Sequence, residues 1–220
     1  MIVIKPSFEF VDEIDGVKIL KKIERMSRIC YKSEAQITDT SYIQMVKHIL
    51  ERGHESQLEH ASVTVIVTCD RGVTHEIVRH RLASYSQEST RYCNYSKDKF
   101  GNELTFIKPC FWDEDTAIKS VLEETSLYKD WFGAMQFAEK RYLDMIAKGA
   151  KPEQARSILP NSLKTEIGIT MNLREWRHFF KLRTAKAAHP QMREIACQML
   201  KEFSNRIPMV FDNIQGDSDA

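Results

Sequence analysis

The sequence has few glycines, and none of them forms a nucleotide-binding loop. Its 220 residues include eight glycines, and no two are spaced as in GxGxxG or GxxxxGK[ST]. Those spacings build the Rossmann turn and the P-loop, in which the backbone approaches phosphate groups closely. Both loops are therefore excluded, and a bound nucleotide would have to be held by another route.

Cysteine is scarce too, and long apolar runs are absent. The five cysteines are odd in number and scattered, without a CxxC pair, which is poor material for a disulfide framework or a thiolate zinc site. The N-terminal apolar run stops at Lys5-Pro6 without the cleavage site of a signal peptide. No run approaches the roughly 18 residues of a membrane span. We expect a reduced, cytoplasmic protein with no membrane partner.

An excess of charge of either sign is also lacking. Lys and Arg number 32 against 31 Asp and Glu, a formal net charge of +1. This balance excludes a polybasic attraction to nucleic acid or membrane over the whole chain, and 42% hydrophobic residues argue against intrinsic disorder. An anion site must therefore come from a local concentration of positive charge.

Hydrophobic periodicity predicts strands and helices without βαβ alternation. Strands are predicted over residues 1–5, 61–69, 104–108 and 163–172, and helices over 17–31, about 38–53, 72–81, 113–148, 174–183 and 190–206. This order favours an α+β fold, a mixed or antiparallel sheet flanked by helices, over a doubly wound sheet. We expect a single domain over residues 1–214 and a disordered tail over 215–220. Core positions are expected at Trp131, Met135 and Tyr142 of the long helix.

The densest polar stretch lies in residues 71–99, where six Lys or Arg face three acids. It contains Arg79-His80-Arg81 and, after seven residues, Ser89, followed by Arg91-Tyr92. Arginine forks bind phosphate oxygens bidentately, and hydroxyl and amide groups read the other edges of a small ligand. The pattern predicts an anion pocket, for either a mononucleotide or an RNA phosphate. In the RNA interpretation Tyr85, Tyr92 and Tyr95 would serve as stacking platforms.

Two histidine pairs resemble metal motifs without matching them. His75-Glu76 with His80 is HExxxH, one residue too long to place both imidazoles on one helix face. His54-Glu55 with Glu59-His60 has no convergent helical spacing, so no metal site is expected. A second polar cluster lies at 172–189, where Arg174 and His178 share a helix face, whereas Arg177 and Lys181 are interpreted as exposed helix charges.

The motif RHR, seven residues, then Ser, continuing to Arg91-Tyr92, resembles the signature of the flavin-dependent thymidylate synthases. Further similarities to that family are spread over about residues 25–200. They are Arg28-Ile29-Cys30-Tyr31, His54-Glu55-Ser56 through Glu59-His60, Ala155-Arg156 with Leu159-Pro160, Asn172-Leu173-Arg174, and Leu182-Arg183 to His189-Pro190-Gln191. The resemblance implies synthesis of dTMP from dUMP, with methylenetetrahydrofolate as carbon donor, NADPH as reductant and FAD as hydride carrier. It also implies an α+β homotetramer with active sites between subunits.

The resemblance also assigns site residues. The dUMP site would use Glu76, Arg79, Gln87, Glu88, Ser89, Arg91, Arg156 and Arg183. FAD would be held by Cys30, His54, Ser56, Glu59, Arg79, His80, Arg81, Gln87, Asn172, Arg174, His178 and His189. Arg183 is the catalytic candidate, because a guanidinium at the uracil edge favours negative charge on the pyrimidine and activates C5 without a cysteine nucleophile.

The sequence departs from the family pattern at three places. Ser86-Gln87-Glu88 stands where many members have Asn-Glu and an apolar or small residue, Glu76 stands where glutamine is common, and two residues are inserted between Arg183 and His189. Two other functions stay open: an RNA-binding module using residues 71–99, and a flavoprotein relative that lacks methyl transfer.

Overall fold

The computed structural model describes residues 1–112 and 127–214. The strands of this part are β1 (Ile2–Ile4), β2 (Ser7–Phe10), β3 (Ser62–Asp70), β4 (Ala83–Gln87), β5 (Thr105–Ile107) and β6 (Lys164–Asn172). The α-helices are α1 (Gly16–Tyr31), α2 (Ser41–Glu51), α3 (Arg71–Ile77), α5 (Leu127–Ala147), α6 (Pro152–Ala155), α7 (Leu173–Arg183) and α8 (Pro190–Arg206). Short 3₁₀ turns are η1 (Glu34–Gln36), η2 (Glu55–His60), η3 (Asp98–Phe100) and η5 (Arg156–Ile158). The mixture confirms the predicted α+β class.

The residues group into two compact units. The first unit comprises Met1–Ser7, Val67–Ile77 and Ser86–Ile167, and the second comprises Phe8–Ile66, Val78–Tyr85 and Gly168–Ala220. The chain passes from one unit to the other inside β2, β3, β4 and β6 and directly after α3. These four strands therefore carry residues of both units.

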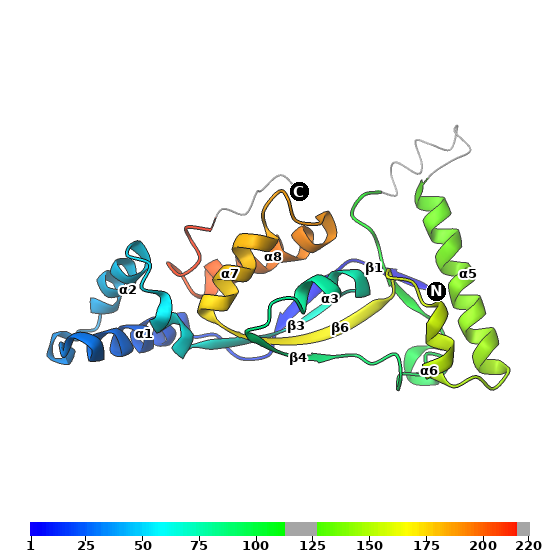
Figure 1. The fold of residues 1–220 in the computed structure, drawn as a ribbon, viewed down its shortest axis with the longest axis horizontal. Helices are drawn as coiled ribbons and strands as arrows, with labels where there is room; N and C mark the ends of the chain where they lie inside the picture. Colours follow the sequence, from blue (N-terminus) through cyan, green and yellow to red (C-terminus); the bar gives the residue numbers. More distant parts are fainter. Residues whose placement is uncertain (113–126, 215–220) are drawn as a thin grey trace. The chain divides into compact units, whose positions relative to one another are not determined.

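Two sheets contain the strands. The larger has the order β2-β3-β6-β4, and the smaller joins β1 to β5 in parallel, with Ile2 opposite Thr105 and Ile4 opposite Ile107 (Figure 1). β3 and β6 run antiparallel, since Leu173 N–H donates to the Ala61 carbonyl and Arg71 N–H donates to the Leu163 carbonyl at the other end. The structure thus contains an antiparallel pair, β3–β6, and a parallel pair, β1–β5, in agreement with the expected mixed or antiparallel sheet.

Alternation along β3 and β6 determines which side chains are buried. Val63, Val65 and Val67 on one face of β3 are fully buried, as are Ile167 and Ile169 on β6. β-Branched residues pack well on a pleated, half-buried surface. The alternating burial along β3 and β6 confirms the two strands that were predicted from alternating side chains.

The helices of the second unit pack around aromatic rings. Trp176 and Phe180 of α7 contact Phe203 of α8, with ring centroids 4.9 Å and 5.1 Å away. Asp15 begins α1 as its N-cap by accepting a hydrogen bond from Lys18 N–H at 2.9 Å. The next residue must be glycine, because a Cβ on Gly16 would lie 2.0 Å from the Arg206 carbonyl oxygen.

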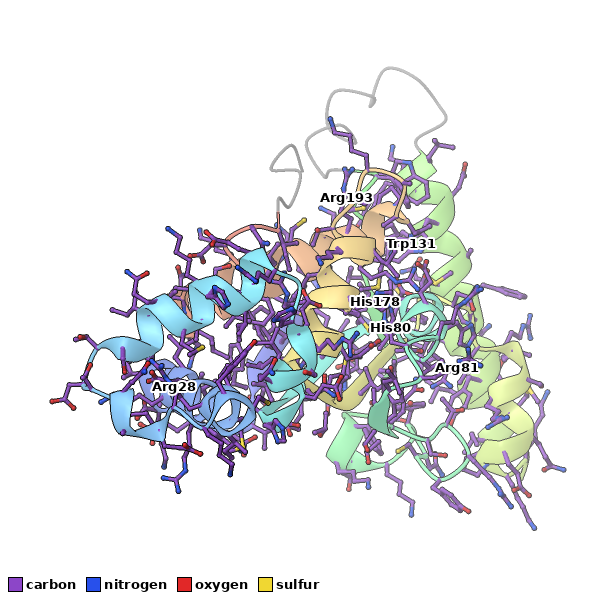
Figure 2. All side chains as sticks on the ribbon, turned by 60° about the vertical axis from the view of Figure 1, so that its left-hand side comes forward. Arg28, His80, Arg81, Trp131, His178 and Arg193 are labelled. Atoms are coloured by element: carbon purple, nitrogen blue, oxygen red, sulfur yellow. The ribbon has the colours of Figure 1, made fainter. Side chains whose placement is uncertain are left out.

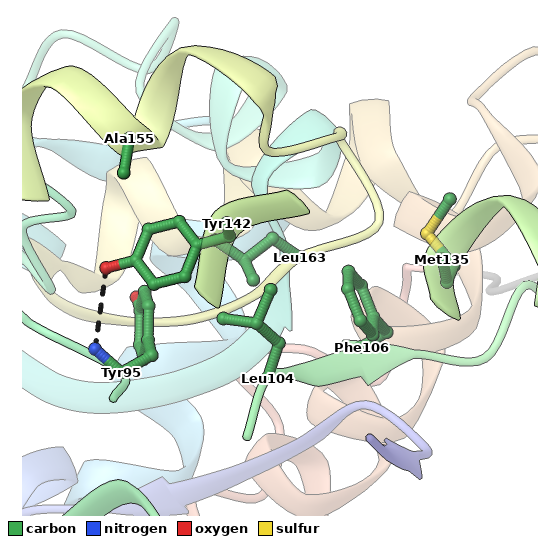
Figure 3. Close-up of a cluster of buried hydrophobic side chains, with 7 residues drawn as sticks. All are labelled: Tyr95, Leu104, Phe106, Met135, Tyr142, Ala155 and Leu163. Carbon is green, nitrogen blue, oxygen red and sulfur yellow. Dashed lines mark hydrogen bonds between the residues drawn. The ribbon is translucent and has the colours of Figure 1, made fainter. Parts of the chain in front are cut away.

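The first unit has a separate apolar cluster (Figure 3). Its buried members are Tyr95, Leu104, Phe106, Met135, Tyr142, Ala155 and Leu163. Inside it, Tyr142 Oη lies 3.5 Å from the Tyr95 backbone nitrogen, which donates to it. Met135 and Tyr142 are core residues, as predicted, and Trp131 is partly buried against the cluster.

Several expectations about individual elements are wrong. α3 ends at Ile77 rather than at Arg81, and residues 83–87, for which no strand was predicted, form β4. β2 was not predicted, although its four residues alternate between polar and aromatic side chains. The beginning of the predicted 113–148 helix and the predicted disorder of 215–220 lie outside the described residues. None of the described helices is long and apolar enough to cross a membrane.

The apolar cluster of the first unit yields a stability prediction. Replacing the fully buried Phe106 by Ala removes a ring and leaves a cavity, so Phe106→Ala should lower the free energy of unfolding by about 3–5 kcal/mol. Leu127→Ala at an exposed position of the same unit should change it by less than about 0.5 kcal/mol. Urea titrations followed by far-ultraviolet circular dichroism measure both, and equal losses would contradict the assignment of Phe106 to the core.

Candidate active site

The RHR segment belongs to the second unit, with its histidine side chain buried and its two arginine side chains exposed to solvent. His80 is 4% exposed, whereas Arg79 and Arg81 are exposed. Because α3 has ended at Ile77, the chain turns here, and the backbone carbonyl of His80 accepts a hydrogen bond from Tyr85 Oη at 2.6 Å. This turn replaces the predicted helical continuation.

Helix α7 begins where strand β6 ends. Asn172, an efficient N-cap residue, accepts a hydrogen bond from Glu175 N–H at 2.9 Å. The helix then presents Arg174, His178 and Lys181 at its surface. The prediction that Asn172 ends a strand and that a helix opens at Arg174 is confirmed to within one residue.

His80 contacts α7 through both ring nitrogens. Its Nδ1 lies 3.1 Å from Glu175 Oε1, and its Nε2 accepts a hydrogen bond from Arg183 Nε at 3.1 Å. The Phe179 ring lies with its centroid 5.0 Å away and the His178 ring 5.5 Å away, and Figure 2 shows the two histidines next to each other. Burial, with the nearby Arg183, lowers the pKa of His80 against the opposing influence of Glu175. The neutral imidazole is therefore the form present at neutral pH.

One nitrogen from each of His80 and His178 and one oxygen from Glu175 lie within 4.8 Å of one another. A cation there would need a lone pair on one ring nitrogen of His80, and both nitrogens already have a partner. Arg183 is always a donor, so Nε2 is the acceptor and Nδ1 carries the proton. This hydrogen-bond pattern favours a positioned histidine over a metal ligand.

A cavity of about 520 Å³ opens beside α7 in the second unit. It is lined by Glu55, Glu59, Leu82, Asn172, Arg174, Glu175, His178 and Lys181. Arg174 Nη1 donates to Glu59 Oε1 at 2.5 Å, and this hydrogen bond raises the pKa of Arg174. The volume suits a small organic ligand, cationic side chains suit phosphate oxygens, and carboxylates can accept hydrogen bonds from ribose hydroxyls. The donor set fits a nucleotide.

The cavity brings together only part of the expected FAD set. Glu59, Asn172, Arg174 and His178 line it, and His80 is joined to it through Glu175. Expected residues that are not among its lining residues, although they belong to the same unit, are Cys30, His54, Ser56, Arg79, Arg81 and His189. Arg28, two residues before Cys30 at the end of α1, is held by Glu24 at 3.0 Å and Gln36 at 2.9 Å.

In the first unit, Gln87 and Glu88 are held by their neighbours. Gln87 Nε2 lies 3.1 Å from Thr74 Oγ1, to which it donates. Glu88 accepts hydrogen bonds from Tyr95 Oη at 2.8 Å and Lys164 Nζ at 3.1 Å. Both carboxylate oxygens of Glu88 are therefore engaged within the unit, an arrangement that its assignment to dUMP did not anticipate.

The remaining dUMP residues of the first unit are more accessible. Arg91 is exposed and lies 3.4 Å from Glu153, and Arg156 is exposed at the start of η5. Ser89 is partly exposed and its Oγ accepts from Arg91 N–H at 3.3 Å, while Glu76 is partly buried. Two guanidinium groups and a hydroxyl are thus available for a phosphate group.

The structure corrects the expectation for Arg177. This residue is 2% exposed, and its guanidinium donates to Glu55 Oε1 at 3.0 Å, to Asn213 Oδ1 at 2.9 Å and to the Val210 carbonyl. It is therefore a buried connector between α7 and the C-terminal segment, not an exposed charge. Lys181, with a side chain 52% exposed, does fit that expectation.

The cysteines and tyrosines differ widely in exposure. All five cysteines lie in the described residues as thiols, of which Cys30 and Cys110 are exposed and Cys69 is buried. Tyr95 is 6% exposed and hydrogen-bonded to Glu88. It is thus not available as a stacking platform for RNA, which weakens that interpretation, whereas Tyr92 is 77% exposed.

Sequence reasoning missed Glu175, Glu55, Lys181 and Leu82 as residues around the cavity. Glu175 stands three residues after the N-cap Asn172, a spacing that indicates helix capping. Its partner His80 is 95 residues earlier in the chain, and no local pattern connects the two.

Comparison with known proteins agrees with the sequence resemblance. A family model, "Thymidylate synthase complementing protein" (Thy1), matches residues 15–209. Flavin-dependent thymidylate synthase of Pyrococcus furiosus is 39% identical over 176 residues, which cover 80% of this chain and 68% of that protein. The Pyrococcus abyssi enzyme is 41% identical over 72% of this chain and 61% of its own length. The Mycobacterium avium enzyme is 32% identical over 96% of this chain and 84% of its own.

A solved structure shares the fold. The UMP/dUMP methylase PolB from Streptomyces cacaoi aligns with a TM-score of 0.73 and 22% identity, covering 96% of this chain and 95% of that one. With the family match over residues 15–209, the chain belongs to the thymidylate synthase complementing protein family, the family of flavin-dependent thymidylate synthases.

The buried position of Arg177 yields a second stability prediction. Arg177→Ala removes the partner of Glu55 and leaves the Val210 carbonyl without its donor, so the free energy of unfolding should fall by about 3–5 kcal/mol. Lys181→Ala on the same helix should change it by less than about 0.5 kcal/mol. Urea unfolding of both variants measures the difference. A loss at Arg177 no larger than that at Lys181 would show that its buried contacts do not stabilise the fold.

Proposed function

We propose that the protein is a flavin-dependent thymidylate synthase that converts dUMP to dTMP. Methylenetetrahydrofolate would donate the carbon and NADPH the reducing equivalents, with FAD as the cofactor. The observation that supports this most is the hydrogen bond between His80 and Arg183, which are 103 residues apart. It joins the RHR motif to the C-terminal block, the two segments on which the family resemblance mainly depends.

The cavity beside α7 is the proposed place for part of the FAD. Arg174 and Lys181 would offer positive charge to its phosphates, and Asn172 and His178 would offer hydrogen bonds. A ligand phosphate would compete with Glu59 for Arg174, because the two are hydrogen-bonded in this structure. When bound, the flavin supplies hydride chemistry that no side chain can provide.

The dUMP residues would act through positive charge and fixed geometry. Arg91 and Arg156, with the Ser89 hydroxyl, would bind the phosphate, and Arg79 and Gln87 would contribute further polar contacts. Arg183 would face the uracil edge, where a fixed guanidinium stabilises negative charge as it develops on the ring. Since the family resemblance implies a homotetramer with sites between subunits, residues of one site need not come from one chain.

A cysteine nucleophile is not part of this proposal. Burial raises the pKa of the Cys69 thiol, which keeps it protonated, and a thiol is a much weaker nucleophile than a thiolate. Activation of C5 would instead depend on the charge supplied by Arg183. The cytoplasmic location inferred from the sequence stays a prediction.

The test is turnover by the purified, FAD-loaded protein. With dUMP, methylenetetrahydrofolate and NADPH all present, we expect dTMP by chromatography, and no dTMP when any one of the three is left out. Replacement of all five cysteines by serine in a variant that remains folded should leave dTMP formation in place.

Other outcomes identify the alternatives. NADPH oxidation without dTMP would identify a flavoprotein relative that lacks methyl transfer. Binding to single-stranded RNA that weakens steeply with salt, by a protein that takes up no flavin, would favour the RNA-binding function.

A further inference from the structure

The buried histidine of the RHR motif is held at both ring nitrogens by residues of one helix. Glu175 lies near the beginning of α7 and Arg183 at its end. Helical side chains point back toward the N-terminus, and the long arginine side chain reaches the same imidazole that Glu175 contacts. We propose that Glu175 is a positioning residue that acts through His80 to hold the Arg183 guanidinium in its working orientation. The functional part of this inference rests on the proposed function of Arg183.

The positions of the protons follow from the partners. A guanidinium nitrogen can only donate, so His80 Nε2 must accept from Arg183. The single proton of the neutral ring is then on Nδ1, which donates to the Glu175 carboxylate. Among the described residues, Glu175 is the acceptor for this buried N–H, and it thereby keeps the ring from rotating away from Arg183.

The burial of Glu175 distinguishes it from the other acids of the cavity. The side chain of Glu175 is 9% exposed, whereas the side chains of Glu59 and Glu55 are 45% and 21% exposed and pair with Arg174 and Arg177. The capping hydrogen bond at Asn172 uses the backbone N–H of Glu175, so its side chain is not needed for it. The Glu175 carboxylate is therefore available to accept the hydrogen bond from His80 Nδ1–H.

The charges around His80 predict a pH signature. The groups that face it are Glu175, His178 and Arg183 of α7, together with Tyr85 of β4. Protonated His80 would present N–H groups on both nitrogens, and Nε2 could no longer accept from Arg183. Activity should therefore fall as the pH falls through the pKa of His80. Because Glu175 raises that pKa, its replacement by a neutral residue should move the acidic limb of the kcat profile to lower pH.

The first experiment measures the tautomer without using activity. Protein labelled with ¹⁵N in its histidines, with the His80 signal assigned by its loss in His80→Gln, should show a protonated Nδ1 and an unprotonated Nε2. A proton on Nε2, or zinc retained by the His80, Glu175 and His178 set after exhaustive dialysis, would overturn the proposal. Failure of the protein to make dTMP would refute the proposed function but leave this result unaffected.

The second experiment uses steady-state kinetics of two variants. Glu175→Gln keeps an oxygen that can accept from Nδ1–H, so kcat should stay within about threefold of the parent while its acidic limb moves to lower pH. Glu175→Leu removes the acceptor, and kcat should fall about 100-fold through misorientation of Arg183, with a KM for dUMP changed less than about threefold. Glu202→Gln is the matched control, a carboxylate of the same unit that pairs with Arg206 on α8, and it should leave kcat unchanged.

A double variant tests whether Glu175 acts through Arg183. In an Arg183→Lys background, Glu175→Leu should cause less than about a twofold further loss, because the geometry it supports has already been removed. The inference would be overturned if the losses of kcat in the two single variants multiplied in the double variant. It would also be overturned if the acidic limb of Glu175→Gln did not move, or if Glu175→Leu kept the kcat of the parent. If Glu175→Leu does not fold, the inference is still tested by the pH profile of kcat in Glu175→Gln and by the tautomer of His80 in the parent protein.

Discussion

The structure of the site depends on one buried imidazole that must satisfy both of its nitrogens. In the part of the chain that the structure describes, the partners of His80 are Glu175 and Arg183, each 3.1 Å away. A buried polar group left without a partner costs about 1–3 kcal/mol, so this arrangement ties the RHR turn to both ends of α7. The Phe179 ring packs against the imidazole with its centroid 5.0 Å away, and His80 is only 4% exposed. A residue that looks like part of a surface-binding motif is thus the internal connection between two distant segments.

Pairing of charges explains how a nearly neutral chain can offer a cationic site. In the second unit, Arg174 pairs with Glu59, and Arg177 pairs with Glu55, which also lies 3.8 Å from Lys181. Exposed pairs of this kind contribute little to stability and can be exchanged for a ligand phosphate, whereas the buried Arg177 pair is structural. The net charge of +1 therefore describes compensation within the chain and carries no information about the charge that an individual site presents.

Local patterns predicted the elements well, and long-range contacts account for what they missed. The helix over 190–206 and the buried alternation of β6 follow from hydrophobic period and capping, and both are confirmed. β4 was missed because Ala83–Gln87 is polar and small, and it becomes a strand by hydrogen-bonding to β6 at the edge of the sheet. Arg177 was placed at the surface because helix position does not reveal burial by a later segment near Val210. Glu175 could be predicted as a capping-region acid, but its pairing with His80 depends on the tertiary fold.

The central proposal is that the segments joined by His80 and Arg183 bind a flavin, and that dUMP binds close enough to change its surroundings. The visible absorption spectrum of the purified protein, reconstituted with FAD and measured before and after addition of dUMP, tests this claim most directly. Our account predicts flavin absorption bands that stay with the protein through gel filtration and shift when dUMP is added, because substrate changes the surroundings of the flavin. A protein that retains no flavin, or a bound flavin whose spectrum is indifferent to saturating dUMP, would contradict it.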